Sequence, residues 1–184
     1  MKTSSDPGLV AEVRGYGHFD VDGCYNCGSC ACVCELAEDG SLFPRKSLRS
    51  AQLGLRDRLL SSLEPWLCYY CGDCSKTCPR QTEPGESMMT LRRFLTAQYD
   101  WTGLSARMYR SKWWELGMIG VVGLLTGWIM SMLMAGMPTD LTAQGGVKIN
   151  EFLPMARVHA FDWVIAEVLT FFLLSNVARF FWFT

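Results

Sequence analysis

The 184-residue sequence has almost no net charge, because 17 lysines and arginines face 18 aspartates and glutamates. This balance excludes the broad positive field by which proteins attract nucleic acid, so no nucleic-acid partner is expected. The opening residues, MKTSSDPGLVAEVRGYGHF, contain no continuous apolar core and therefore no secretory signal peptide. No segment sustains a two-residue apolar alternation, so we expect a mainly α fold without a sheet.

Cysteine, by contrast, is abundant. The chain has nine cysteines, and eight of them lie in two tight groups. A secreted disulfide scaffold usually carries an even set spread along a small domain. With no signal peptide, the N-terminal part is expected in the cytosol, where thiols stay reduced and can bind metal.

The two groups share one spacing. CYNCGSCACVC begins at Cys24 and CYYCGDCSKTC begins at Cys68, and both contain C-x2-C-x2-C-x3-C. This spacing is typical of bacterial ferredoxins that bind two [4Fe–4S] clusters, in which the fourth cysteine of each run ligates the other cluster. The expected ligand sets are therefore Cys24, Cys27, Cys30 and Cys78 for one cluster, and Cys68, Cys71, Cys74 and Cys34 for the other.

Zinc is the main alternative, because Cys-x2-Cys pairs also build zinc sites. Zinc sites usually use two separated pairs, whereas each group here has four cysteines in one tight run. Cys32 does not fit the spacing, and a small buried side chain is favoured over a ligand or redox role. Proline follows the second run as Pro79, but Glu35 follows the first.

Two helices are expected beside the cysteine runs. Residues 44–60 place Leu48, Ala51, Leu55 and Leu59 at helical spacing, with Pro44 in the first turn. A second helix begins at Pro84 and buries Met88, Leu91 and Leu95. Residues 1–23 are expected to be a loosely structured lead-in. Residues 1–100 are thus assigned to a two-cluster ferredoxin-like domain and residues 101–115 to an interfacial junction.

A membrane domain is expected over residues 116–184. Residues Leu116 to Met137 carry no formal charge before Pro138, and 22 helical residues span about 33 Å, enough to cross a bilayer. Trp113 and Trp114 are expected at the membrane–water interface. The preceding cations, Arg107, Arg110 and Lys112, place that end of the helix on the cytoplasmic side. We expect a multi-pass protein of the inner membrane, with the lipid bilayer as a partner and the cluster domain facing the cytoplasm.

The second apolar segment, residues 159–184, follows a polar connection over 138–158 and contains ionisable groups. His159, Asp162, Glu167 and Thr170 share one side of a helical wheel, which indicates packing against protein, including a further membrane subunit. A location at the wet interface explains His159 and Asp162 but not Glu167. His159 is a candidate axial ligand of a b-type haem, with an ordinary interfacial histidine as the alternative. The second haem ligand has to come from elsewhere, since His18 belongs to the soluble part.

The segments CYNCGSC, FPRKSLRSAQLGL, WLCYYCGDCSKTCPR and PGESMMTLRRF together resemble the C subunit of heterodisulfide reductase, over about residues 20–98. With membrane helices directly after them, the chain is similar to the C subunit of the quinone-interacting membrane-bound oxidoreductase complex. That family fuses a two-cluster domain to a haem b membrane domain with more helices than the two visible here.

The resemblance implies an iron–sulfur electron-transfer subunit that takes no catalytic role itself. It would relay electrons between cytoplasmic flavin-containing or iron–sulfur oxidoreductase subunits and membrane quinone, with two [4Fe–4S] clusters and haem b, in sulfur or sulfate respiration or a related anaerobic metabolism. An independent disulfide reductase is disfavoured because the sequence contains no adjacent cysteine pair. A membrane-anchored redox sensor without a catalytic partner is the remaining alternative, but it would need an output domain for which there is no room.

Overall fold

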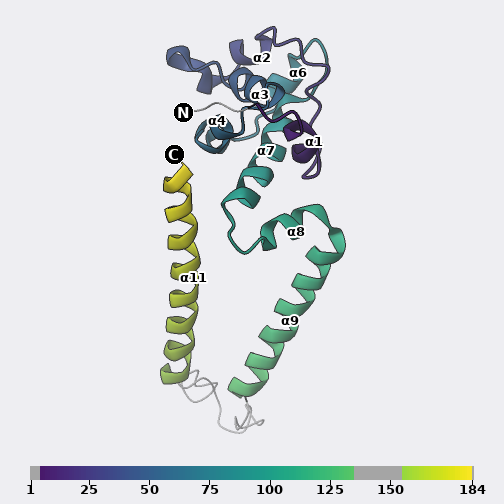
Figure 1. Ribbon diagram of the computed structural model, residues 1–184. Helices are drawn as coiled ribbons and strands as arrows, with labels where there is room; N and C mark the ends of the chain where they lie inside the picture. The colour runs from purple at the N-terminus through teal and green to yellow at the C-terminus, as the bar shows by residue number, and fades with distance from the viewer. Residues whose placement is uncertain (1–4, 135–154, 184) are drawn as a thin grey trace, which may run out of the picture. The chain divides into compact units, whose positions relative to one another are not determined.

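The computed structural model describes residues 5–134 and 155–183. These divide into two units (Figure 1). The first, which we call the head, comprises the residues up to Ser111 together with those from Arg179 onward, and the second runs from Lys112 to Ala178. The predicted domain bounds at 100 and 115 stay predictions.

The described residues are helical and contain no strand, which confirms the mainly α prediction. In chain order the helices are α1 (Leu9–Arg14), α2 (Ser29–Cys32), the 3-10 helix η1 (Glu35–Gly40), α3 (Arg45–Gln52), α4 (Arg56–Leu60), α5 (Glu64–Leu67), α6 (Asp73–Lys76), α7 (Pro84–Tyr99), α8 (Leu104–Arg110), α9 (Lys112–Met134) and α11 (Met155–Phe183).

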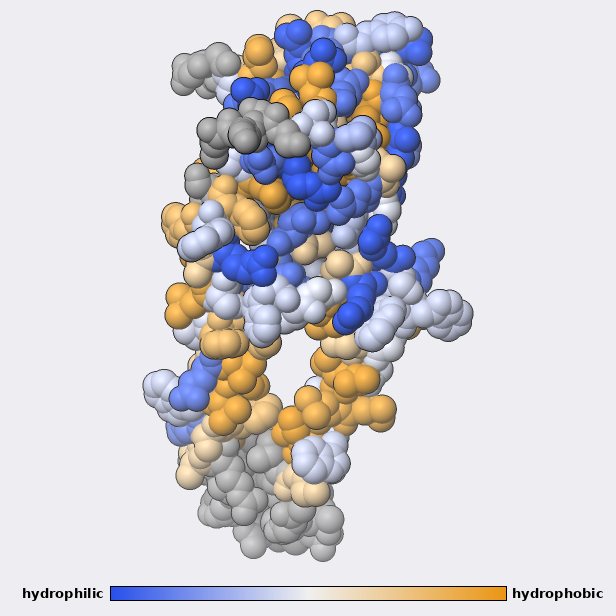
Figure 2. All heavy atoms as spheres, in the orientation of Figure 1, coloured by the Kyte–Doolittle hydropathy of each residue, from blue (hydrophilic) through white to orange (hydrophobic). Residues whose placement is uncertain are grey.

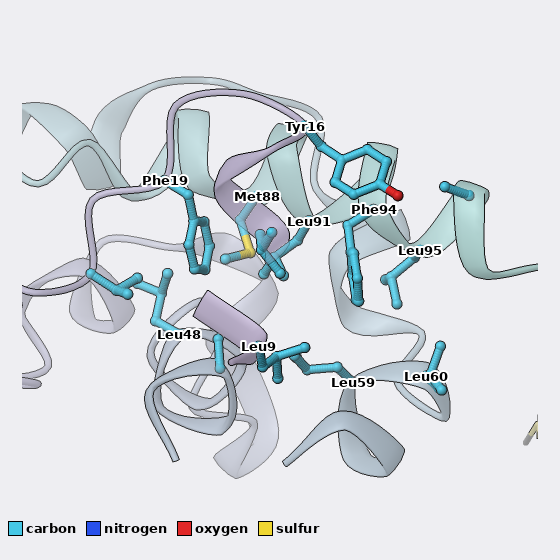
Figure 3. Packing of buried hydrophobic residues seen from close by; sticks show 14 of the residues in the cluster. Leu9, Tyr16, Phe19, Leu48, Leu59, Leu60, Met88, Leu91, Phe94 and Leu95 are labelled. Carbon is cyan, nitrogen blue, oxygen red and sulfur yellow. The ribbon is translucent and has the colours of Figure 1, made fainter. Parts of the chain in front are cut away.

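Helix α7 is the centre of the head. Pro84 begins it, as predicted, and the predicted buried side chains Met88, Leu91 and Leu95 are fully buried. Phe94 joins them and meets the ring of Tyr16 edge-on at 5.7 Å between centroids. Figure 3 shows these side chains pointing into one cluster with residues from the N-terminal segment and from α3 and α4. Burial of such large apolar side chains is the main force that holds the head together.

The N-terminal segment is part of this core, so the prediction of a loose lead-in was wrong. Leu9 and Val13 of α1 are fully buried, and the following chain buries Phe19 and Val21. The Thr90 hydroxyl donates to the His18 carbonyl at 2.7 Å and ties this segment to α7. The apolar residues were hard to recognise because glycine, proline and polar residues separate them.

The predicted helix over residues 44–60 is broken in two. Gly54 adopts φ +68° between α3 and α4, and its carbonyl accepts the Asp6 amide at 2.9 Å. A Cβ at position 54 would lie 2.3 Å from the Asp6 carbonyl oxygen, so only glycine fits there. Pro44 precedes the first helical residue of α3 as its N-cap rather than lying within the first turn.

Helix α8 follows α7, and Asp100, between them, accepts hydrogen bonds at the start of α8. Its carboxylate accepts the Thr102 amide at 2.8 Å and the Ser105 amide at 2.7 Å. Partial burial acts to raise the pKa of Asp100, but the hydrogen bonds from Thr102 and Ser105 outweigh it and hold that pKa at about 2. The junction between the cluster domain and the apolar helices is thus itself an ordered helix.

The second unit consists mainly of α9 and α11, which are long and apolar enough to cross a membrane over Lys112–Met132 and Val158–Phe183. Figure 2 shows hydrophobic atoms along the described parts of both helices. The side chains of Leu124, Leu169 and Leu173 are exposed. Helix α9 begins four residues before the predicted Leu116, and α11 begins within the segment predicted to be a polar connection. The predicted end of the first span at Met137 and Pro138 lies outside the described residues.

Candidate iron–sulfur centre

The two cysteine runs fold into loops with the same backbone pattern. In the first loop Asn26 has φ 56° and Gly28 has φ 95°, and in the second Tyr70 has φ 61° and Gly72 has φ 83°. Both loops therefore use left-handed residues at corresponding positions, which turns the chain tightly between successive cysteines. A short helix follows each glycine at once, α2 after Gly28 and α6 after Gly72.

The first predicted ligand set lines one cavity of about 360 Å³, a volume that includes its open mouth. We call it the Cys24 cavity. Its four cysteines come from both loops: Cys24, Cys27 and Cys30 lie beside Cys78. The remaining wall includes Leu48 of α3 and the side chains of Arg45, Arg80 and Thr82.

The second predicted set lines a separate cavity of about 410 Å³, again including its mouth. We call it the Cys68 cavity. Cys68, Cys71 and Cys74 of the second loop lie here beside Cys34 of the first. Apolar and aromatic residues form the remaining wall: Val33, Leu36, Phe43, Pro44, Tyr69, Tyr70 and Met88, together with Gly72 and Gly85.

Consecutive residues of the chain line the two cavities at two places. Pro44 lines the Cys68 cavity while the next residue, Arg45, lines the Cys24 cavity. At the start of α7, Pro84 lines the Cys24 cavity and Gly85 lines the Cys68 cavity. A single residue step thus leads from one cavity to the other at two places, and groups bound in the two cavities would be close neighbours.

The thiols in these cavities are crowded. Burial, and to a lesser extent the neighbouring Cys24 and Cys74, raise the pKa of Cys30 to about 11. Burial also raises the pKa of Cys34 and Cys74. Several thiolates brought together in a partly buried space repel one another, and a positively charged core among them would offset that repulsion.

Some thiols have hydrogen-bond donors beside them. Cys27 Sγ lies 3.4 Å from the Ser29 hydroxyl oxygen, and this hydrogen bond lowers the pKa of Cys27. Partial burial acts to raise the pKa of Cys78, but hydrogen bonds from Thr82 and nearby backbone amides outweigh it, so that pKa is lowered. Such donors stabilise thiolates, the form of cysteine that binds metal.

The cavities fit clusters better than single ions. Within the described residues, no three or more His, Cys, Asp or Glu side chains are placed to hold one metal ion. Thiolates of a zinc site converge at about 2.3 Å from one point, whereas those of a four-iron cube bind four separate irons. Four thiols spread around a cavity suit the second arrangement. The assignment of each cysteine to a cluster stays a prediction.

The surroundings of the cavities contain polar residues that the sequence prediction missed. Arg45 and Thr82 lie outside the cysteine runs in sequence, so no local pattern marks them. Gly28 and Gly72 could have been found, because both runs read C-Y-x-C-G-x-C.

Two other candidate residues are not among those that line the cavities. Cys32 is exposed, so the prediction of a small buried side chain was wrong: it points away from the core on the four-residue helix α2. His159 is exposed on α11, the helix that also carries Asp162, Glu167 and Thr170. His18 lies in the head, with Nε2 3.4 Å from the Glu83 carboxylate.

The cysteine arrangement is that of a dicluster iron–sulfur protein, and residues 23–83 match the family model of the 4Fe-4S dicluster domain. No solved structure matches the chain. Among curated relatives, a protein of Archaeoglobus profundus, named as similar to the C subunit of heterodisulfide reductase, is 38% identical over 89 residues, which are 48% of this chain and 47% of that protein.

Further relatives carry the same subunit name. The iron–sulfur C subunit of CoB–CoM heterodisulfide reductase from Methanopyrus kandleri is 33% identical over 90 residues, 49% of this chain and 46% of its own. The C subunit of the H(2):CoB-CoM heterodisulfide,ferredoxin reductase of Methanothermobacter marburgensis is 27% identical over 82 residues, 45% of this chain and 44% of its own.

The resemblance to the C subunit of heterodisulfide reductase is confirmed. The chain spans about half the length of the curated relatives it matches. The head is thus similar to an iron–sulfur electron-transfer subunit, and its relatives are parts of complexes with other subunits.

Proposed function

We propose that this chain is the iron–sulfur electron-transfer subunit of a membrane-bound oxidoreductase complex. It relays electrons between a cytoplasmic flavin-containing partner and membrane quinone and has no catalytic site of its own. The observation that carries the proposal is the pair of neighbouring cavities, each lined by four cysteines drawn from both loops. Two [4Fe–4S] clusters bound there would supply one-electron transfer without bond chemistry.

The chain's own residues prepare the cavities for this task. Eight thiolates hold the clusters, and because each set takes one cysteine from the other loop, the two loops are fastened to each other. The apolar wall of the Cys68 cavity, with Phe43 and Met88, keeps water from one side. Consecutive residues line the two cavities at Pro44–Arg45 and at Pro84–Gly85, so the two sites are neighbours between which an electron would pass.

The two apolar helices anchor the head to the bilayer. Their exposed apolar side chains need lipid or other protein around them. Trp113, with 84% of its surface exposed, would lie in the interface near the start of α9. The preceding cations Arg107, Arg110 and Lys112 favour the cytoplasmic side for the head, in a multi-pass arrangement. In a bacterial or archaeal cell this is the inner, cytoplasmic membrane.

The quinone end of the path involves α11. His159 would be one of the side chains that hold haem b, and since His18 lies in the head, a second ligand would have to come from elsewhere. Glu167 lies eight residues further along the same helix and would exchange protons with quinone. The relatives are named as subunits of heterodisulfide reductases. This suggests flavin-containing or iron–sulfur partners in sulfur-linked anaerobic metabolism.

Cys71→Ala tests the electron path. Assembled with its partners, this variant should lose the paramagnetic signal of one reduced cluster and all quinone-linked turnover, since the path is then interrupted. Cys32→Ala is the matched control, because Cys32 is exposed and lies outside both cavities. Full turnover by Cys71→Ala with one cluster absent would contradict the proposed role.

Glu167→Gln tests the membrane end separately. The variant keeps the shape of the side chain but cannot exchange a proton, so quinone reduction should slow while reduction of the clusters by the soluble partner is unchanged. Glu167→Asp, which retains a carboxyl group, should recover part of the rate. An unaltered rate and pH dependence in Glu167→Gln would remove this residue from the proton path.

A further inference from the structure

The two cavities differ in the charges around them, beginning with Arg45. This partly buried arginine lines the Cys24 cavity. Its Nε donates to the backbone carbonyl of Asn26 at 3.0 Å and to the Asn26 side-chain oxygen at 2.7 Å. Both acceptors are neutral, so the positive charge of the guanidinium is directed at the loop without a carboxylate to cancel it.

Arg80 is a second cation at the same cavity. Its Nε donates to the Gly23 carbonyl at 3.2 Å, and its guanidinium lies 4.4 Å from the centre of the Tyr25 ring. In the described part of the chain neither Arg45 nor Arg80 forms an ion pair with Asp or Glu. Both positive charges therefore act on whatever the four thiolates of the Cys24 cavity hold.

Among the described residues, no charged side chain lines the Cys68 cavity, and carboxylates lie just behind its wall. The hydroxyl of Tyr69 donates to Glu35 at 2.8 Å, and that of Tyr70 donates to Glu86. Both tyrosines line the cavity, so each connects its wall to a carboxylate. A negative charge placed in this cavity would be repelled by Glu35 and Glu86.

Two cations near the second loop reduce the difference in charge between the surroundings of the two cavities, but they do not reverse it. Lys76 lies 3.1 Å from the Asp73 carboxylate, so that pair is neutral overall. Arg92 donates to the carbonyls of Pro65, Trp66 and Cys68, behind the loop, and does not line the cavity. Among the described side chains, Arg45 and Arg80 thus lie in the wall of the Cys24 cavity, while Arg92, Glu35 and Glu86 lie behind the wall of the Cys68 cavity.

We propose that Arg45 and Arg80 give the cluster of the Cys24 cavity the higher reduction potential, so that a single electron shared by the two sites resides mainly there. This inference rests on the proposed function only in taking both cavities to hold [4Fe–4S] clusters. The physical reason is that reduction adds one negative charge, which nearby cations stabilise and nearby carboxylates oppose. The equilibrium moves one electron between two sites and involves no proton.

The test is an anaerobic redox titration of the purified complex, followed by electron paramagnetic resonance. The unmodified protein should show two cluster signals with different midpoint potentials. Arg45→Gln combined with Arg80→Gln should lower the higher midpoint and leave the lower one in place. The ratio of the two reduced forms should change about tenfold or more, where tenfold corresponds to about 59 mV for a one-electron couple.

Matched variants separate charge from structure. Arg49→Gln removes a cation one helical turn further along α3, outside both cavities, and should leave both midpoints unchanged. Arg45→Lys with Arg80→Lys keeps the charges and should restore most of the separation. Arg80 is exposed, so Arg80→Gln should not disturb folding. This single variant replaces the double variant in the titration if the double variant does not fold.

The outcomes are distinguishable. The role of the arginines would be overturned if both midpoint potentials stayed unchanged in the folded double variant and in Arg80→Gln. It would also be overturned if only the lower of the two midpoint potentials fell. Absence of any iron–sulfur signal in the unmodified protein would instead overturn the proposed function.

Discussion

The head and the pair of apolar helices are built on opposite principles. In the head, apolar side chains from the N-terminal segment, α3, α4 and α7 cover one another, and Phe94 is completely buried. On α9 and α11 the large apolar side chains face outward, and Leu124 has 78% of its surface exposed. The head therefore supplies its own interior, whereas the helices depend on lipid or partner proteins to cover them.

This difference implies that substitutions should act through separate mechanisms in the two units. In the head, stability depends on packing and on backbone geometry around the cavities. On the helices, whose large apolar side chains are exposed, the compatibility of each side chain with hydrocarbon would be decisive in the proposed membrane location. Changes of equal size at Phe94 and Leu124 should therefore have unequal effects.

The largest effect is expected from Phe94→Ala. It removes a fully buried ring that contacts Tyr16 and should destabilise the head by about 3–5 kcal/mol. The measurement is the guanidinium midpoint for loss of visible cluster absorbance under anaerobic conditions. Leu124→Ala on α9 is the control and should leave that midpoint unchanged. Equal shifts for the two variants would contradict the separation of the units.

Leu124→Arg should have the next largest effect, because it places a charge near the middle of the first apolar span. An arginine at the centre of a membrane helix costs about 2.5–3.5 kcal/mol on insertion scales. The fraction of protein that resists carbonate extraction from membranes should fall, while Leu124→Ala should remain in the membrane fraction. Unchanged retention of the arginine variant would argue against α9 as a span.

A smaller effect is expected from Gly54→Ala, at the break between α3 and α4. Alanine is disfavoured at φ +68°, and its Cβ would collide with the Asp6 backbone, so we expect a loss of about 2 kcal/mol or more in the unfolding free energy. Gly103→Ala is the control. Gly103 has φ +67° but open space around it, so only the backbone cost of about 1 kcal/mol should appear.

The smallest effect concerns the hydrogen bonds that Asp100 accepts at the start of α8. Asp100→Asn should destabilise the head by about 1 kcal/mol, because a carboxylate accepts the Thr102 and Ser105 amides better than an amide oxygen does. The pKa of Asp100 is lowered from 3.8 to about 2, so its stabilisation is complete above about pH 4 and is lost as pH falls toward 2. The difference in guanidinium midpoint between variant and parent should therefore be the same at pH 6 and pH 8. A difference that disappears over that range would contradict this assignment.

Local patterns in the sequence were sufficient for part of this structure. The cysteine runs and the core face of α7 depend on neighbours within a few residues, so their spacing predicts both the grouping of the thiols and the burial of Leu91. The length and apolar composition of the two segments likewise predict helices long enough to cross a bilayer.

Features that depend on distant contacts were missed. Gly54 interrupts a regular helical pattern because of the Asp6 backbone, 48 residues earlier. The N-terminal segment is ordered because α7 covers it, and no periodicity within the segment indicates that. Arg45 reaches the Cys24 cavity only through the fold, so its sequence position in an ordinary amphipathic helix gives no sign of a role near a cluster.

The most direct test of the account is the metal content of the full-length chain purified without oxygen. Two four-iron clusters predict about eight iron atoms and about eight acid-labile sulfides per chain, with paramagnetic signals from two sites after reduction. Stoichiometric zinc, or iron without acid-labile sulfide, would contradict the central claim that the eight cysteines hold two [4Fe–4S] clusters.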